Sequence, residues 1–320
     1  MLKRRFAAGM FSAGVMVLGA GMVSGQNYPS KPVRIVTSPA GGGSDYVSRL
    51  IASGLTGSLG QQVIVENRPS GVIPGETVAK APPDGYILLV GADILWTTPL
   101  FQKTPYDILK DFAPIALTGR TPIVVVVHPS LPVKSIRELI ALAKARPGVL
   151  NYASGPAGSS LHLAAELFKN LAGVNVVRIP YKGGGPAVVA LVGGEVELMF
   201  APSGVAFPHL LSGRLRGLAV GSTQQSLLFP DLPTVAAAGL PGFVAASLYG
   251  IFAPAGTPAA IINRLNHEIV QLLNNTDMKE KFLKAKIEPV GSSPEELAAT
   301  MKSDIARNSK LIKDAGIRVK

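Results

Sequence analysis

The fold of this chain is decided by one stretch, Val33-Arg34-Ile35-Val36-Thr37-Ser38-Pro39-Ala40-Gly41-Gly42-Gly43-Ser44-Asp45. Four of its first five residues are β-branched, which predicts a buried strand over 33–37. The three glycines predict a tight turn. From Ser44 to Leu59 the apolar residues recur at helical spacing, which predicts an amphipathic helix. The stretch is therefore a strand–turn–helix unit, the building block of an α/β fold.

The turn between this strand and helix has the composition of an anion site. Glycines leave the backbone amides at the helix start uncovered, and the helix dipole adds positive potential there. A similar loop recurs in Ala153-Ser154-Gly155-Pro156-Ala157-Gly158-Ser159-Ser160. Two such loops predict a carboxylate held from two sides. The alternative is that each loop is only a tight βα turn, with Ser44 or Asp45 capping the first helix.

The amino-terminal residues have the pattern of a secretion signal. Lys3-Arg4-Arg5 are followed by an apolar run from Phe6 to Val23, and small residues follow at Val23-Ser24-Gly25. This pattern predicts a signal peptide over residues 1–25, cleaved near Gly25, and an exported protein. An uncleaved membrane anchor is the alternative. The run is interrupted by Gly and Ser, however, and is short for a span of about 20 residues.

Composition argues against several classes of function. With no cysteine, the chain has no disulfide, thiol nucleophile or thiolate metal site. The four histidines, His128, His162, His209 and His267, lack the spacing of metal ligands. The sequence also has no nucleophile elbow and no phosphate-binding loop motif. We therefore expect a protein that is not an enzyme and has no metal or cofactor. An exported serine hydrolase that uses Ser159 or Ser160 with His162 is the enzyme alternative.

The charge of the chain is basic but dispersed. The formal net charge is +11, and three of the positive charges belong to Lys3, Arg4 and Arg5. The others form no concentrated stripe, so nucleic-acid binding is not expected. A basic surface of this kind steers anions towards the protein.

The remaining sequence repeats the strand–helix alternation, which predicts parallel, doubly wound sheets. There are too many strands for one ordinary sheet, which favours two lobes. We place the chain crossings near Ala116–Pro122 and near Ser222–Pro233, because the second region is a proline-punctuated stretch. Lobe I then comprises residues 26–119 and 230–320, and lobe II residues 120–229. Both glycine-rich loops follow strands and so lie at the ligand-binding edge of their sheets.

Motifs along the mature chain resemble those of a known family. They include Tyr28-Pro29-Ser30-Lys31-Pro32, Glu66-Asn67-Arg68-Pro69, Pro83-Asp84-Gly85-Tyr86, Gly158-Ser159-Ser160-Leu161-His162, Pro180-Tyr181-Lys182-Gly183-Gly184 and Ala253-Pro254-Ala255-Gly256-Thr257-Pro258. In this order they resemble the Bordetella uptake gene family, the periplasmic solute receptors of tripartite tricarboxylate transporters. The resemblance covers essentially the whole mature chain.

The resemblance implies a type II periplasmic binding protein, a two-lobed clamshell of two doubly wound sheets. It also implies a monomer in the periplasm that binds a small carboxylate and delivers it to the permease subunits of a tripartite transporter. The loops Ser38–Asp45 and Ser154–Ser160 would hold that acid. The candidate ligand-binding residues are Ser38, Pro39, Ala40, Gly41, Gly42, Gly43, Ser44, Asp45, Ser154, Ala157, Gly158, Ser159, Ser160, Tyr181 and Ala201.

Two positions depart from the family pattern. Family members often have an aromatic residue near Ser38, and Asp or Asn where Ala201 stands. The second change predicts the loss of a hydrogen bond to the distal end of the ligand. The identity of the acid stays open among dicarboxylates, aromatic acids, amino acids and nicotinate-like acids. A sensory receptor for a membrane histidine kinase is the other non-enzyme alternative.

Overall fold

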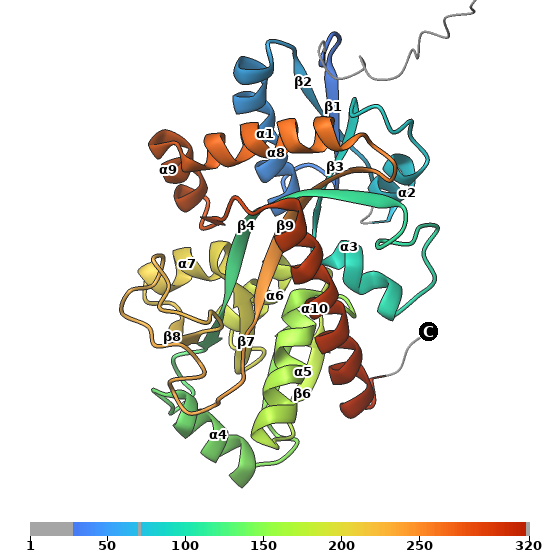
Figure 1. The fold of residues 1–320 in the computed structure, drawn as a ribbon. Helices are drawn as coiled ribbons and strands as arrows, with labels where there is room; N and C mark the ends of the chain where they lie inside the picture. The colour runs from blue at the N-terminus through green and yellow to red at the C-terminus, as the bar shows by residue number, and fades with distance from the viewer. Residues whose placement is uncertain (1–27, 70–71, 318–320) are drawn as a thin grey trace, which may run out of the picture.

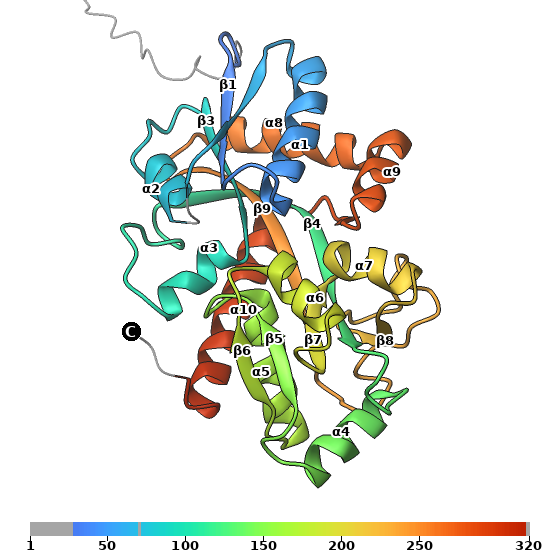
Figure 2. The same cartoon turned by 180° about the vertical axis from the view of Figure 1, so that it is seen from behind.

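The computed structural model describes residues 28–69 and 72–317, which form two lobes joined by long strands (Figure 1). The predicted signal peptide lies outside the described residues. Within the described ranges, no helix is both long and apolar enough to cross a bilayer. Figure 2 shows from behind that helices flank the strands of each lobe.

Lobe I is built on a mixed sheet. Its strands are β1 (Val33–Thr37), β2 (Val63–Asn67), β3 (Ile87–Ala92), the first part of β4 (Phe112–Val127), β9 (Ala246–Pro254) and β10 (Glu288–Pro289). Its helices are α1 (Gly43–Leu59), α2 (Ile73–Ala79), α3 (Ile94–Thr97), the 3-10 turn η1 (Thr98–Leu100), α8 (Ala259–Asn274) and α9 (Thr276–Lys284). Strands β1, β2 and β3 are parallel, as expected from the βα units. Strand β9 pairs antiparallel with β3.

Lobe II has the same general plan. Its strands are the second part of β4, β5 (Asn151–Ser154), β6 (Val177–Pro180), β7 (Leu198–Pro202) and β8 (Arg216–Val220). Its helices are α4 (Ile136–Ala145), α5 (Ser160–Ala172), α6 (Gly184–Val192) and α7 (Ser203–Leu211). Strand β5 is parallel to β6 and β7. The final helix, α10 (Pro294–Asp314), runs from lobe I down to α5 (Figure 1).

Strands β4 and β9 carry the chain between the lobes. They pair antiparallel from Phe112 opposite Pro254 to Pro122 opposite Ala246. From Ile123 onwards β4 pairs with β7 and β8 instead. The expectation of wholly parallel sheets is therefore wrong for these strands. The reason is geometric, because a chain that leaves a lobe and returns through the same junction must run in opposite directions.

The second crossing lies later in the chain than the expected boundary at 229/230. Val235, Leu240 and Phe243 are buried in the lobe II core, together with Val125. The crossing is therefore at the start of β9, near Ala246. The proline-punctuated stretch that suggested a linker belongs to lobe II, because Phe229 within it is buried in a lobe II core cluster. Proline marks a break in regular structure, and such a break need not be a lobe boundary.

Replacing Phe243 with alanine tests this assignment. The ring is fully buried and its centroid lies 6.3 Å from those of Phe168 and Phe200. We expect F243A to lower the free energy of unfolding by about 3–5 kcal/mol, with amide protection lost first in β5, β7 and α5. The control is L227A, at a side chain that is 81% exposed. Loss of protection in lobe I instead would contradict the assignment.

Candidate functional site

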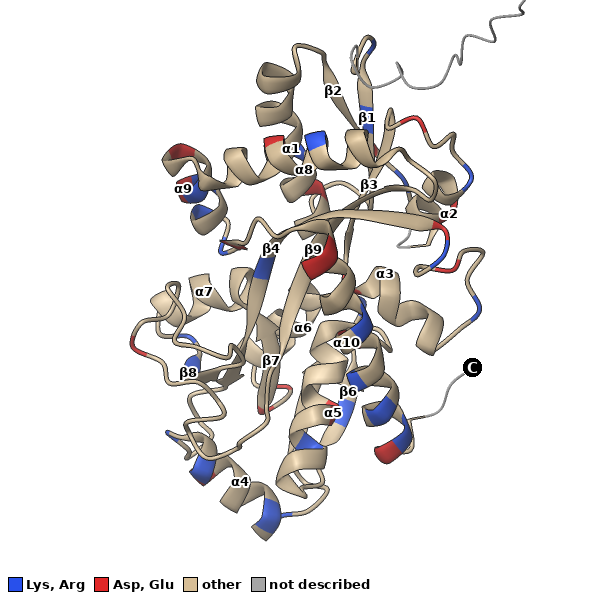
Figure 3. Ribbon diagram, viewed as in Figure 1, with Lys and Arg blue, Asp and Glu red and all other residues tan. Residues whose placement is uncertain are grey.

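A cavity of about 490 Å³ lies between the lobes. It is lined by Gly41, Gly42, Gly43 and Tyr46 of the first loop and α1, by Thr121 and Tyr249 of the crossing strands, by Pro202, Gly204 and Val205 at the start of α7, and by Ala285 and Ile287. Figure 3 shows Lys, Arg, Asp and Glu scattered over both lobes. In the part of the chain that the structure describes, the residues that line the cavity carry no ionisable group other than the tyrosine hydroxyls. An anion in this cavity would therefore depend on backbone amides and hydroxyl groups.

The first predicted loop borders this cavity through its glycines. Gly41 has φ of +85°, a left-handed conformation that favours glycine. The N-cap of α1 is Gly42, and no side chain caps the first turn. The expectation that Ser44 or Asp45 is the N-cap is therefore wrong. Without a side-chain cap, the first-turn amides of α1 keep their capacity to donate to an anion.

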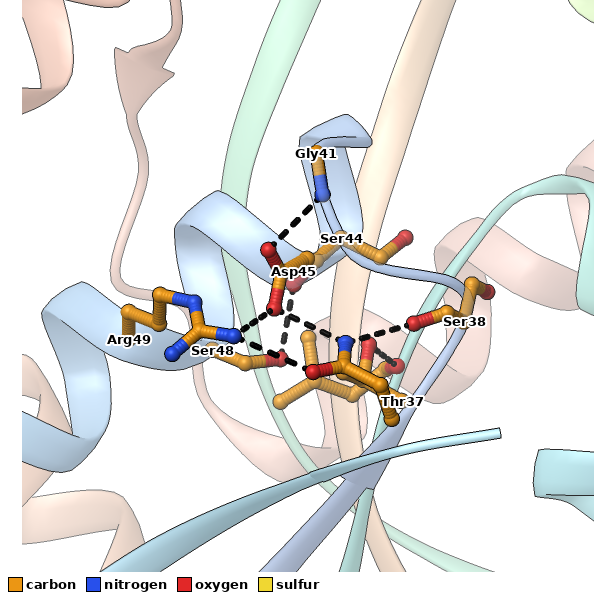
Figure 4. A network of polar contacts seen from close by, with 9 residues as sticks. Thr37, Ser38, Gly41, Ser44, Asp45, Ser48 and Arg49 are labelled. Carbon is orange, nitrogen blue, oxygen red and sulfur yellow. Dashed lines mark hydrogen bonds and ion pairs between the residues drawn. The ribbon is translucent and has the colours of Figure 1, made fainter. Parts of the chain in front are cut away.

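The side chain of Asp45 stabilises the conformation of the first loop (Figure 4). Its carboxylate accepts from the Gly41 amide at 3.0 Å and from Asn67 Nδ2 at 2.8 Å, and it pairs with Arg49 at 3.0 Å. Burial raises the pKa of Asp45, but the hydrogen bonds from Gly41, Arg49 and Asn67 outweigh burial and lower it. Both carboxylate oxygens thus have protein donors, and the side chain braces the turn.

The start of α7 faces the cavity from lobe II. Pro202, Gly204 and Val205 line it, and Pro202 is an N-cap without a side-chain cap bond. The Ser203 hydroxyl donates to the Lys286 carbonyl at 2.7 Å, which ties α7 to lobe I. The cavity is therefore bordered by one helix start from each lobe, but the lobe II helix is α7, whereas the sequence predicted α5.

The second predicted loop makes a contact between the lobes and does not line this cavity. Thr97 donates to the Gly158 carbonyl at 3.3 Å, and the Ser160 and Ser247 hydroxyls are 2.6 Å apart. His162 Nδ1 accepts from the Gly158 amide at 3.2 Å. Burial, with help from nearby positive charge, lowers the pKa of His162 to about 4. This neutral, packed histidine agrees with its interpretation as a structural residue.

The other predicted residues lie around the two loops. Four predicted residues of the first loop do not line the cavity: Ser38, Pro39, Ala40 and Ser44. The same holds for three residues of the second loop: Ser154, Ala157 and Ser159. Tyr181 is half-buried and packs against the lobe II core. Ala201 is fully buried in that core, opposite Val124 of β4. The position that suggested a lost ligand contact thus faces protein, while the next residue, Pro202, reaches the cavity.

Sequence reasoning missed the residues supplied by the crossing strands. Thr121 and Tyr249 line the cavity, but both stand in ordinary strand patterns with no motif around them. Tyr249 lies directly against the first helical turn, because a Cβ on Gly43 would be only 2.2 Å from its hydroxyl oxygen. This close approach gives the third glycine of the turn a packing role that could be recognised only from the structure.

Alanine substitutions at the adjacent glycines Gly42 and Gly43 test the close contact between Gly43 and Tyr249. In G43A the new methyl group would overlap a buried aromatic ring, so we expect the free energy of unfolding to fall by about 1–3 kcal/mol. G42A is the matched control, because a Cβ there meets only the Pro39 carbonyl at 3.6 Å. Denaturant unfolding of both variants makes the comparison. Equal stability of the two would contradict the contact.

The brace made by Asp45 leads to a prediction on pH. We expect D45N to lower the free energy of unfolding by about 1–3 kcal/mol at neutral pH, because an amide cannot satisfy all three donors. The pKa of Asp45 in the folded protein is below its value in the unfolded chain, which is about 3.9. The stabilisation is therefore fully present at pH values above about 3.9 and is lost as the pH falls through the folded-state pKa.

Urea unfolding between neutral pH and about pH 3 measures this effect. The difference between wild type and D45N should shrink at the acid end. The control D277N removes a carboxylate whose side chain is 70% exposed, and it should change little at any pH. A constant difference across the pH range would show that the charge of Asp45 does not matter.

Comparisons with known proteins agree with this architecture. The family described as "Tripartite tricarboxylate transporter family receptor" matches residues 47–317. Protein BugT of Bordetella pertussis is 37% identical over 316 residues, which cover 96% of this chain and 97% of BugT. The structure of R. palustris Rpa4515 with adipate has a TM-score of 0.80 and 35% identity, covering 90% of this chain and 98% of that one.

A second solved structure, MatC from Rhodopseudomonas palustris with bound malate, has a TM-score of 0.76 and 30% identity. It covers 89% of this chain and all of its own. These matches confirm the family resemblance and the two-lobed type II binding-protein fold. Because the family match spans both lobes and the strands that join them, this chain belongs to the tripartite tricarboxylate transporter family of periplasmic receptors.

Proposed function

We propose that this protein is a receptor for a small carboxylic acid, which binds in the cavity between the lobes and is delivered to the permease of a tripartite transporter. The observation that carries this proposal is the uncapped start of α1 at the cavity wall, next to Gly41, Gly42 and Gly43. Backbone amides at a helix start are well suited to a carboxylate. Charge-assisted hydrogen bonds contribute about 1.5–3 kcal/mol each, so a few of them suffice for tight binding.

The cavity chemistry supports an acid over a cation. Among the described residues, no carboxylate lines the cavity, and Asp45 already accepts from Gly41, Arg49 and Asn67. A cationic ligand would find positive dipole ends and no counter-charge there. The structures of two relatives are described as containing adipate or malate, both of them carboxylic acids.

The contacts between the lobes suggest how binding would be linked to delivery. Ser203 reaches Lys286 on one side of the cavity. On another face, Thr97 donates to Gly158. An acid held by both lobes would favour the arrangement in which these contacts form, because a ligand shifts the equilibrium towards the state that binds it better. We propose that a permease recognises this ligand-bound arrangement.

A thermal-shift screen tests the ligand class. We expect at least one of adipate, malate, succinate and benzoate to stabilise the protein, by about 2.7 kcal/mol at a hundredfold excess over Kd. The corresponding amides and an alkylammonium salt are the controls. Stabilisation by neutral or cationic solutes but by none of the acids would overturn the proposal. Uptake of the stabilising acid by cells that lack this protein then tests delivery.

A further inference from the structure

We propose that the hydroxyl group of Tyr249 donates a hydrogen bond to the carboxylate held at the start of α1, and that Tyr249 thereby positions the acid in the cavity. This inference rests on the proposed function and adds a side-chain donor to it. Tyr249 belongs to neither glycine-rich loop, and no sequence motif points to it.

Tyr249 lies against the start of α1, beside the first glycine-rich turn. The Tyr249 hydroxyl lies so close to Gly43 that a Cβ there would be 2.2 Å from the oxygen. Both residues line the cavity. A carboxylate that accepts from the first-turn amides of α1 would therefore lie beside this hydroxyl group. A glycine at this position lets the phenol approach the helix start, where a side chain would separate the two.

The hydroxyl group of Tyr249 is buried and has one long hydrogen bond among the described residues. Tyr249 is only 8% exposed. Among the described residues, its hydroxyl oxygen accepts a hydrogen bond from Thr121 Oγ1 at 3.5 Å. That distance is at the outer limit of a hydrogen bond. Buried tyrosine hydroxyls usually have a close partner, because an unmet donor is costly. A ligand carboxylate in the cavity would supply the missing acceptor.

Other hydroxyl groups near the cavity already have backbone acceptors. Tyr46 donates to the Lys281 carbonyl at 3.3 Å, and Ser203 donates to the Lys286 carbonyl at 2.7 Å. Thr121 and Tyr249 also line the cavity. Their hydroxyl groups hydrogen-bond to each other, and among the described residues neither bonds to a backbone carbonyl. Of the two, Tyr249 is the one that touches the helix start.

Tyr249 is held rigidly by the strands around it, and its hydroxyl group is protonated at neutral pH. The backbone of Tyr249 pairs with Ala92 on one side and Gly119 on the other, and its carbonyl accepts from Thr118 at 3.0 Å. The phenol is thus held on the strands that join the lobes. Burial raises the pKa of Tyr249, and the nearby Asp93 raises it further while the Thr121 contact lowers it. The net increase keeps the group a hydrogen-bond donor at neutral pH.

The substitution Y249F removes the hydroxyl oxygen and keeps the ring. We expect isothermal titration with adipate, malate, succinate and benzoate to give a Kd about ten- to a hundredfold higher for whichever acid binds the wild type. The melting temperature of the ligand-free protein should stay the same, because among the described residues the hydroxyl hydrogen-bonds only with Thr121, at 3.5 Å. A purely structural role would lower that temperature.

The matched control is Y106F. Tyr106 is also buried, at 6% exposure, but its hydroxyl donates to the Leu95 carbonyl at 3.0 Å. We expect Y106F to lower the melting temperature of the free protein and to leave the Kd unchanged. If Y249F binds the same acid as tightly as the wild type, the role of Tyr249 is overturned and the proposed function stands. If no acid binds the wild type, both proposals fail.

Discussion

The antiparallel pairing of β4 with β9 is the interaction on which the rest of the structure depends. It runs from Phe112 opposite Pro254 to Pro122 opposite Ala246 and forms the junction between the lobes. In lobe I, β3 adds to β9 of this pair, and in lobe II, β7 and β8 pair with the continuation of β4 from Ile123 onwards. The cavity between the lobes opens beside the same junction, and Thr121 and Tyr249 bring the junction itself into the cavity wall. The element that joins the lobes is therefore also part of the candidate site.

Several side chains strengthen the junction around this pair. Glu288 of β10 accepts from Arg120 and from Ser226 of lobe II, both at 2.8 Å. Trp96 donates to Asp304 of α10 at 2.8 Å. Glu288 and Asp304 are both buried, and buried carboxylates need such donors to offset desolvation. The lobes thus meet through polar contacts such as Ser226 with Glu288, and also through an apolar cluster in which Phe101 packs with Leu163 and Leu311.

Much of the fold could be predicted from the sequence because its signals are local. The strand at Val33–Thr37 was predicted with the bounds that the structure has, and α1 differs from its prediction by one residue at its start. The crossing near Ala246 could not be predicted, because the lobe to which Phe243 belongs depends on packing between residues distant in sequence.

The sequence by itself determined the family, the succession of βα units and the glycine turn at Gly41, since these depend on residue type and short spacing. Only the tertiary structure decided what that turn faces. It places α7 across the cavity from the turn and Tyr249 directly against the turn, puts the second loop against Thr97, and buries Ala201 in lobe II. The physical reason is that a site between two lobes depends on how the lobes are joined, and that junction is made by strands far apart in the chain.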